Sequence, residues 1–552
     1  MGLLTTMLAF WIIIFVMFVM INRGIWVFTD VSKSLTMFML EKALGPPIDF
    51  VEGRKGSAST TWIMHGALWM IPSSTITFCG LWLAHDPDAL HSLSSWGLNP
   101  SSSSLILAGI LTASYGSGGM MLNGVAMHVI PELGGTRLAS EKNAVLMALV
   151  WTIGVVILFI GANNPEILGI KVMLVSSGIL LLSGAAVIVN ILLTAASRTK
   201  KMALPAWMMI IGLVSAPISV VSLFVSGAHD TGTGQWLATR MTGASFSLML
   251  AGAILYSASR GSGNPLWSRS LAAVTMVGTI LTISSAGVFD GGVAADFLGI
   301  QKASFEPTRN EIIAGSFLLA MSLIPVIALS ANVMATMRGD DVFMENPDHP
   351  GMPEINLAAI ALVPISIGSL LVHTDHLTGT GEFSGIQWTL AMMGVWLVFV
   401  PGALGSALCI FPEASGRNVL SMNRSRWAYW LMAGGAFGLI FSMMSDFSQA
   451  SLNQADAIIE ISIVDRLSVL GSILFYGTVI GSIYHCLNLI SGSFRGSLVD
   501  DDQPNSSTSI SSPYVLTKET TVRKILAQRE GKLDTVVIPE SNSDSPGSPT
   551  EL

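Results

Sequence analysis

Histidine and aspartate side chains are the first candidates for chemistry in this sequence. The string HTDHLTGTGE places His373, Asp375 and His376 close together, and AHDPDALH places His85 and His91 around two aspartates. Imidazole and carboxylate groups at such spacing can bind Zn²⁺ or Cu²⁺, or respond to pH. A hydrated polar loop contains the same residue types, so both interpretations stay open for each string.

A further carboxylate stands at the end of a long apolar segment. In ISSAGVFDGG, Asp290 follows Phe289 where this segment ends. A charge at such a depth is costly in a membrane and by default indicates a functional position. The sequence alone leaves open whether Asp290 belongs to an ion pathway, pairs with Arg240 or faces the outer water.

The composition indicates a membrane protein with many spans. Of the 552 residues, 51% are hydrophobic and only 11% are charged, and the mean hydropathy is +0.64. Soluble domains carry about 25% charged residues. The net charge of −8 argues against a nucleic-acid partner. We therefore expect a multi-pass protein of the cell membrane whose main surroundings are the lipid bilayer.

Hydropathy divides the chain into three parts. Residues 1–59 are expected to form an uncleaved N-terminal transmembrane helix and a cytoplasmic connector. Residues 496–552 are polar and rich in Ser and Pro, which predicts a disordered cytoplasmic tail. The part between them, residues 60–495, has twelve apolar runs: about 60–84, 104–130, 143–161, 172–196, 204–227, 238–258, 270–288, 312–336, 354–372, 386–411, 427–446 and 467–491.

The distribution of Lys and Arg supports twelve helices with both ends of the unit inside. The loops assigned to the cytoplasm hold 16 of these residues and the outer loops hold 5. Cytoplasmic loops normally carry such an excess. Three inner loops also resemble one another: PELGGTRLASEKNAVLMAL, SRGSGNPLWSRSLAAVTMV and PEASGRNVLSMNRSRWAYWLM. These loops follow the second, sixth and tenth helices, so they are spaced four helices apart, which predicts a threefold repeat. The alternative is that the likeness has no such meaning, because Gly and Arg are common in any inner loop.

These motifs resemble subunit I of the heme–copper oxidase superfamily, and most closely its cbb-type oxidase and nitric oxide reductase branches. TTWIMHGALWMIPSSTITFCGLWLAHDPDAL is similar to the first helix of that family, and the three inner loops are similar to the loops after its second, sixth and tenth helices. The resemblance covers about residues 60–495. It implies an all-α membrane bundle of twelve helices with a pseudo-threefold repeat, to which this chain adds one N-terminal helix.

The family resemblance also implies six histidine ligands for two hemes and a copper ion. Counted from the loop motifs, none of these positions holds histidine here. Trp236 of the W-x-x-H motif is kept, but a threonine replaces its histidine. The positions are Ala108 or Gly109 on the second helix, Thr239 on the sixth, Phe289 and Asp290 on the seventh, and Leu390 and Met392 on the tenth.

Such a ligand set predicts that no cofactor is held, because Met392 is the sole plausible remnant heme ligand. The expected role is a non-catalytic paralogue of the oxidase core subunit, working with other membrane subunits in a hetero-oligomer or as an assembly partner of a respiratory or copper-dependent complex. Two alternatives remain: an active oxidase or nitric oxide reductase with unusual ligands, and an ion- or solute-translocating protein. If the hemes are lost, bulky side chains including Phe289, Leu390, Met392 and Trp396 are expected to fill their space.

Overall fold

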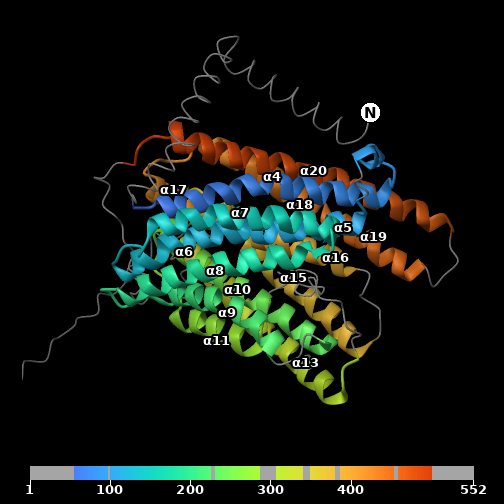
Figure 1. The fold of residues 1–552 in the computed structure, drawn as a ribbon, viewed down its shortest axis with the longest axis horizontal. Helices are drawn as coiled ribbons and strands as arrows, with labels where there is room; N and C mark the ends of the chain where they lie inside the picture. The colour runs from blue at the N-terminus through green and yellow to red at the C-terminus, as the bar shows by residue number, and fades with distance from the viewer. Residues whose placement is uncertain are drawn as a thin grey trace, which may run out of the picture.

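The computed structural model describes residues 55–96, 100–225, 230–285, 306–339, 349–379, 386–452 and 458–499. Nearly all of the described chain is helical (Figure 1). The expected N-terminal helix and the tail beyond residue 499 lie outside the described residues. The region that was expected to begin at residue 60 begins three residues earlier, because the first helix starts at Ser57.

The helices and the single short hairpin follow one another along the chain. The first half contains α4 (Ser57–His85), η2 (His91–Trp96), α5 (Ser102–Leu111), η3 (Thr112–Gly118), α6 (Gly119–Gly134), α7 (Glu141–Asn163), β1 (Glu166–Ile167), β2 (Ile170–Lys171), α8 (Val172–Ala196), α9 (Leu204–Val225), α10 (Gly232–Ser262) and α11 (Arg269–Thr282). The second half contains α13 (Arg309–Met321), α14 (Leu323–Arg338), α15 (Met352–Thr378), α16 (Gln387–Met393), η6 (Gly394–Phe399), α17 (Val400–Ser415), α18 (Met422–Phe437), α19 (Leu439–Leu452) and α20 (Ile458–Arg495). The strands β1 and β2 pair antiparallel.

The bundle is an all-α membrane protein. In the described part of the chain, 10 helical segments are long and apolar enough to cross a bilayer, which takes about 20 residues. Two further apolar helices, Leu204–Ile218 within α9 and Arg269–Thr282, are shorter. Each of the twelve runs expected from hydropathy overlaps a described helix, and ten of them reach spanning length.

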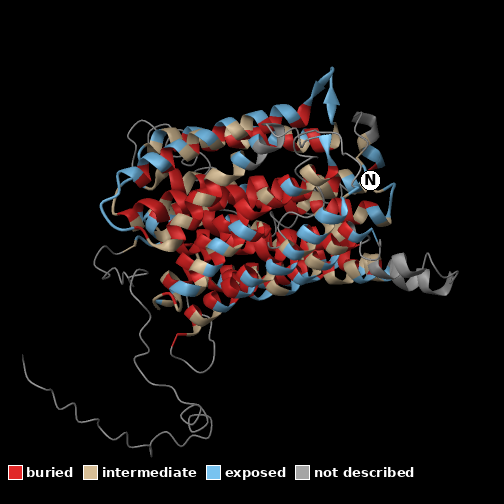
Figure 2. Cartoon of the chain, turned by 90° about the horizontal axis from the view of Figure 1, so that it is seen from below, coloured by how far each residue is buried: buried red, intermediate tan, exposed pale blue. Residues whose placement is uncertain are grey.

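Three spans form the centre of the bundle: α5 with η3 and α6, then α10, then α16 with η6 and α17. In their most apolar windows, 89%, 94% and 100% of the residues are buried. These spans contact one another, and the other helices surround them (Figure 2). The outer helices instead expose large apolar side chains such as Leu182 and Leu193, which fits contact with lipid.

The three inner loops that resemble one another in sequence are also alike in structure. Each loop begins at a glycine that ends a central helix and has a positive φ. Glycine adopts this conformation at little energetic cost because it has no side chain. Five residues later, a serine side chain caps the next helix by accepting a backbone N–H. The pairs are Gly135 with Ser140, Gly263 with Ser268, and Gly416 with Ser421.

An asparagine from a third helix holds each capping serine. Its side-chain oxygen accepts the serine backbone N–H at 2.9, 3.0 and 3.0 Å, and its side-chain amide donates to the serine carbonyl at 2.8, 2.9 and 3.1 Å. We call this double hydrogen bond a clasp. The three clasps are Asn190 of α8 with Ser140, Asn332 of α14 with Ser268, and Asn488 of α20 with Ser421.

One difference separates the third loop from the first two. Thr194 and Thr336, each four residues after the clasp asparagine, accept a backbone N–H from the loop at 2.9 and 3.1 Å. The third helix has Gly492 at that position, where a Cβ would lie 2.9 Å from the Cα of Val419. The third loop therefore lies closer to its helix, and a glycine makes that approach possible.

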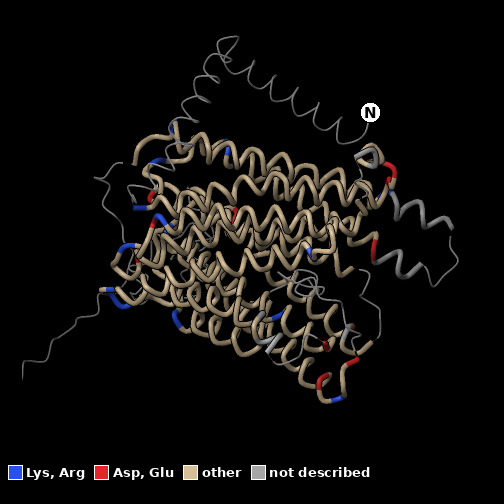
Figure 3. Tube along the Cα trace, in the orientation of Figure 1, with Lys and Arg blue, Asp and Glu red and all other residues tan. Residues whose placement is uncertain are grey.

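The end of the bundle that carries these three loops is called the basic end below. Figure 3 shows most Lys and Arg segments at this end, on the left, and many of the Asp and Glu segments at the other. The asymmetry agrees with the bias read from the sequence, since excess positive charge marks one side of a membrane protein.

Candidate functional site

The two ligand positions expected on the second helix lie on α5 and leave no room for a larger side chain. Ala108 is fully buried. A Cβ added at Gly109 would lie 2.3 Å from the hydroxyl oxygen of Thr77 on α4. The backbones of α4 and α5 therefore touch where the resemblance places an imidazole.

The remaining described ligand positions are also buried in the bundle. The Thr239 hydroxyl donates to the Gln235 carbonyl of its own helix at 3.0 Å. Leu390 packs against α15, and Met392 is 1% exposed. Phe289 and Asp290 lie outside the described residues, so the expected fate of the seventh-helix pair stays a prediction.

Aromatic rings occupy the space between the central helices. Phe246 of α10 makes edge-to-face contacts with Tyr115 of η3 at 5.4 Å and with Phe399 of η6 at 5.5 Å between ring centroids. Trp396 contacts Phe475 of α20 in the same way at 5.8 Å. These rings pack in the described part of the core, where Leu390 and Met392 are also buried, and a cavity of about 80 Å³ remains beside Tyr115 and Phe246.

The expected ligand positions do not fit a heme. Protein ligands to heme iron are His, Met, Cys or Tyr side chains. Among the described positions Met392 has a donor sulfur, while Ala108, Gly109 and Leu390 have no donor at all. An iron held between the second and tenth helices would therefore lack one axial ligand at these positions.

The histidines of the first outer string lie at the surface. His85 is the last residue of α4, and His91 begins η2. The backbone N–H of Asp88 donates to Asp86 at 3.2 Å in the turn between them. His91 is exposed, so both interpretations of this string stay predictions.

The second string is not a hydrated loop, because its first residues lie inside α15. His373 and Asp375 are each 4% exposed. The indole N–H of Trp236 on α10 donates to Nδ1 of His373 at 3.1 Å, and the Arg240 guanidinium lies over the Trp236 ring at 5.5 Å. The structure thus joins Trp236 of α10 to a histidine that sequence analysis placed in a possible metal-binding string.

No metal cluster is found among the described side chains. Within them, no three residues of the types His, Cys, Asp and Glu come close enough to hold an ion. The side chain of His376 lies outside the described part, so its place beside His373 and Asp375 stays a prediction.

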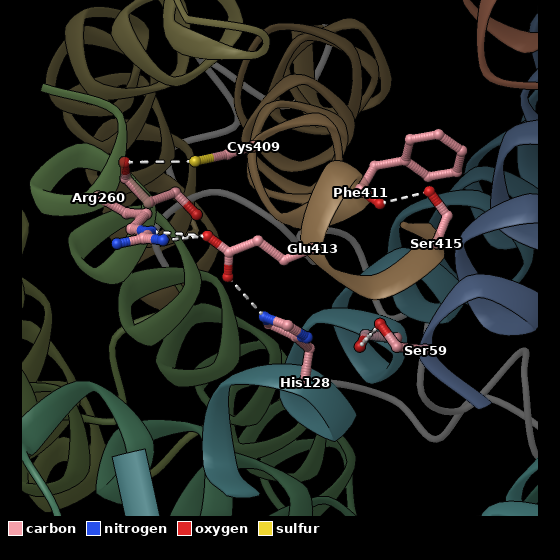
Figure 4. A network of polar contacts seen from close by, with 9 residues as sticks. Ser59, His128, Arg260, Cys409, Phe411, Glu413 and Ser415 are labelled. Carbon is pink, nitrogen blue, oxygen red and sulfur yellow. Dashed lines mark hydrogen bonds and ion pairs between the residues drawn. The ribbon is translucent and has the colours of Figure 1, made fainter. Parts of the chain in front are cut away.

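An ionic cluster joins the three central helices at the basic end (Figure 4). Glu413 of α17 lies between Arg260 of α10 and His128 of α6. The carboxylate accepts from Arg260 Nε at 2.8 Å and contacts His128 Nε2 at 3.2 Å. The three side chains are 10–29% exposed, so the charges are paired and partly screened by water.

Sequence analysis missed a buried pair of ionisable side chains. Glu354 of α15 and His485 of α20 are 1% and 0% exposed, and Oε1 of the first lies 3.5 Å from Nε2 of the second. The signal was present, because His485 stands within an apolar span and Glu354 begins one. Hydrophobic periodicity does not show that two such residues face each other.

No model of a known protein family matches the chain, and a search of curated proteins finds no significant match. The interpretation of the site therefore depends on the chemistry of its own residues.

Proposed function

We propose that the chain is a non-catalytic, cofactor-less relative of the heme–copper oxidase core subunit. It acts as a membrane subunit or assembly partner of a respiratory or copper-dependent complex. The observation that carries this proposal is the core chemistry: the positions for axial ligands hold Ala108, Gly109 and Leu390, and aromatic rings pack between the same helices.

The repeated loops support the family part of the proposal. Three loops of equal length share a left-handed glycine, a capping serine and an asparagine clasp. Unrelated loops have no reason to share all three features, whereas one ancestral unit present three times would have them. A twelve-helix bundle with a pseudo-threefold repeat, including the shorter α9 and α11, follows from that unit.

The charge distribution supports an orientation. The basic end faces the cytoplasm of a cell membrane, which places the C-terminus of the chain inside as well. The exposed apolar side chains of the outer helices fit contact with lipid and with other membrane subunits. The protein then presents a preformed helical scaffold to partners and contributes no redox centre of its own.

Heme content tests the proposal directly. The full chain is purified from membranes in mild detergent, and a pyridine hemochrome spectrum and metal analysis are recorded beside an authentic heme–copper oxidase treated identically. We expect far less than one heme per chain, and co-purification of defined membrane subunits. About one heme per chain would overturn the proposal in favour of an active oxidoreductase, and its loss in Met392→Leu would identify the ligand.

The subunit role has its own test. Mild-detergent extracts are analysed by size and by mass spectrometry of the co-purified chains. A hetero-oligomer of constant composition is expected. A chain that migrates alone under conditions that keep other respiratory complexes intact contradicts the subunit role.

A further inference from the structure

A cavity opens at the basic end between the start of α15 and the first turns of α18. Its volume is about 250 Å³, and its wall includes His349, Glu354, Ser425, Arg426 and Tyr429. A water molecule takes about 30 Å³ in the liquid, so several fit. The lining is polar enough to hydrogen-bond them, since it offers imidazole, hydroxyl, guanidinium and carboxyl groups.

Glu354 forms the buried limit of this cavity and faces His485. Among the described residues, neither carboxyl oxygen of Glu354 and neither ring nitrogen of His485 has a hydrogen-bond partner. Leaving such groups without a hydrogen bond in an apolar interior is energetically unfavourable. Water in the cavity, or a proton held between the two groups, relieves that cost.

Glu354 is surrounded by residues from three other helices. From α18, Arg426 and Tyr429 line the same cavity, and Glu354 acts electrostatically on Tyr429. From α17, Gly405 faces Glu354, where an added Cβ would lie 3.0 Å from the Glu354 Cβ. From α20, His485 is the ion-pair partner found among the described side chains.

Another wall residue, His349, lies within electrostatic range of the ionic cluster of the central helices. The charges of Arg260 and Glu413 both act on this imidazole. His349 also contacts the Pro350 carbonyl at 3.1 Å through Nδ1, which fixes the ring beside the cavity. His349, Arg426 and Tyr429 are therefore the ionisable groups that line the cavity together with Glu354.

We propose that Glu354 and His485 form a proton-exchange site that takes up one proton from water at the basic end and returns it there through this cavity. The proton passes to the carboxylate or to the imidazole from a hydronium ion, or from a cavity water that bulk water reprotonates, and the pair gains one positive charge. No bond other than that to hydrogen changes. The site is independent of heme content, so it stands or falls separately from the function proposed above.

Infrared difference spectroscopy on the full-length protein in lipid nanodiscs tests the site. Glutamate labelled with ¹³C separates its carboxyl band from that of aspartate. We expect a glutamic-acid C=O band that still changes in amplitude above about pH 6, where exposed glutamates with a pKa near 4.3 are ionised, and that shifts on transfer to D₂O. The band is lost in Glu354→Gln, and in His485→Gln it titrates with a displaced midpoint. The control Glu132→Gln, at an exposed glutamate of the same end, leaves it unchanged.

Two results would overturn the proposal. One is a wild-type spectrum with no glutamate band that responds to pH or D₂O above about pH 6. The other is a responsive band that persists in Glu354→Gln. The wild-type titration decides the first point without any substitution, so a variant that fails to fold does not remove the test.

Discussion

Replacing Asn332 by alanine removes one clasp and measures how strongly the clasps hold the bundle. Asn332 is fully buried, and its amide makes two hydrogen bonds to the backbone of Ser268, at 3.0 and 2.9 Å. An interhelical hydrogen bond in a membrane protein contributes about 0.6 kcal/mol on average. The substitution also leaves the Ser268 N–H without its partner, at about 1 kcal/mol, whereas the Ser268 carbonyl still accepts the Ala272 N–H at 3.2 Å. The expected loss in the free energy of unfolding is therefore about 2–3 kcal/mol.

Thermal unfolding followed by a thiol-reactive dye suits this measurement. Cys79, Cys409 and Cys486 are all free and buried, so they react only when the bundle opens. Unfolding entropy is about 2.1 cal/mol/K per residue, so a chain of this size should lose roughly 1 °C in midpoint per kcal/mol. We expect Asn332→Ala to unfold about 2–3 °C lower than the wild type at the same scan rate.

The matched control is Asn418→Ala. This side chain makes one exposed hydrogen bond to the Ser497 hydroxyl at 2.9 Å, and its loss should change the free energy by about 0.5 kcal/mol or less. Because the three clasps are alike, Asn190→Ala and Asn488→Ala should show shifts similar to that of Asn332→Ala. Equal midpoints for Asn332→Ala and Asn418→Ala would refute the reasoning that the clasps stabilise the fold.

Three further predictions use the same unfolding assay. Gly118→Ala should destabilise by about 1–3 kcal/mol, because its Cβ would lie 2.4 Å from an aromatic carbon, whereas Gly178→Ala, with open space around it, should not. Glu413→Ala should lower the free energy of unfolding by about 1.5–3 kcal/mol, because Arg260 and His128 lose their carboxylate partner. The control Glu132→Ala, at an exposed glutamate, should be nearly neutral. Equal midpoints for the two variants would contradict a stabilising role of the ionic cluster. Burial lowers the pKa of His349 from its usual 6.5. The unfolded chain therefore binds a proton at His349 more readily than the folded chain, so stability should fall as pH drops below about 6.5. If the unfolding midpoints of the wild type and of His349→Gln changed with pH in parallel, this prediction would be contradicted.

The membrane class and the positions of the spans could be predicted from the sequence because both depend on local composition. An apolar run of spanning length forms a helix whatever its neighbours are, since the bilayer offers its backbone no other partner. The glycine and serine signals of the three repeated loops are local as well. The structure places Gly135, Gly263 and Gly416 at helix ends, where the loop motifs predicted turns.

The partners of side chains from different helices could not be predicted in this way. His373 and Asp375 resemble a polar loop in sequence, yet α15 continues through both and buries them. The clasp asparagines carry no special signal in their own helices. Their role depends on the rotation of each helix against a loop that lies far away in the sequence.

The sequence by itself determined that this is a multi-pass helical protein, where its helices run, and which ligand residues it does not have at the positions that the family resemblance marks. Only the tertiary structure decided what occupies the centre and which charges meet. Phe246 reaches Tyr115 and Phe399, and Glu354 reaches His485, because helix packing angles and side-chain volumes bring them together. Those quantities belong to pairs of helices and are not encoded in the periodicity of either one.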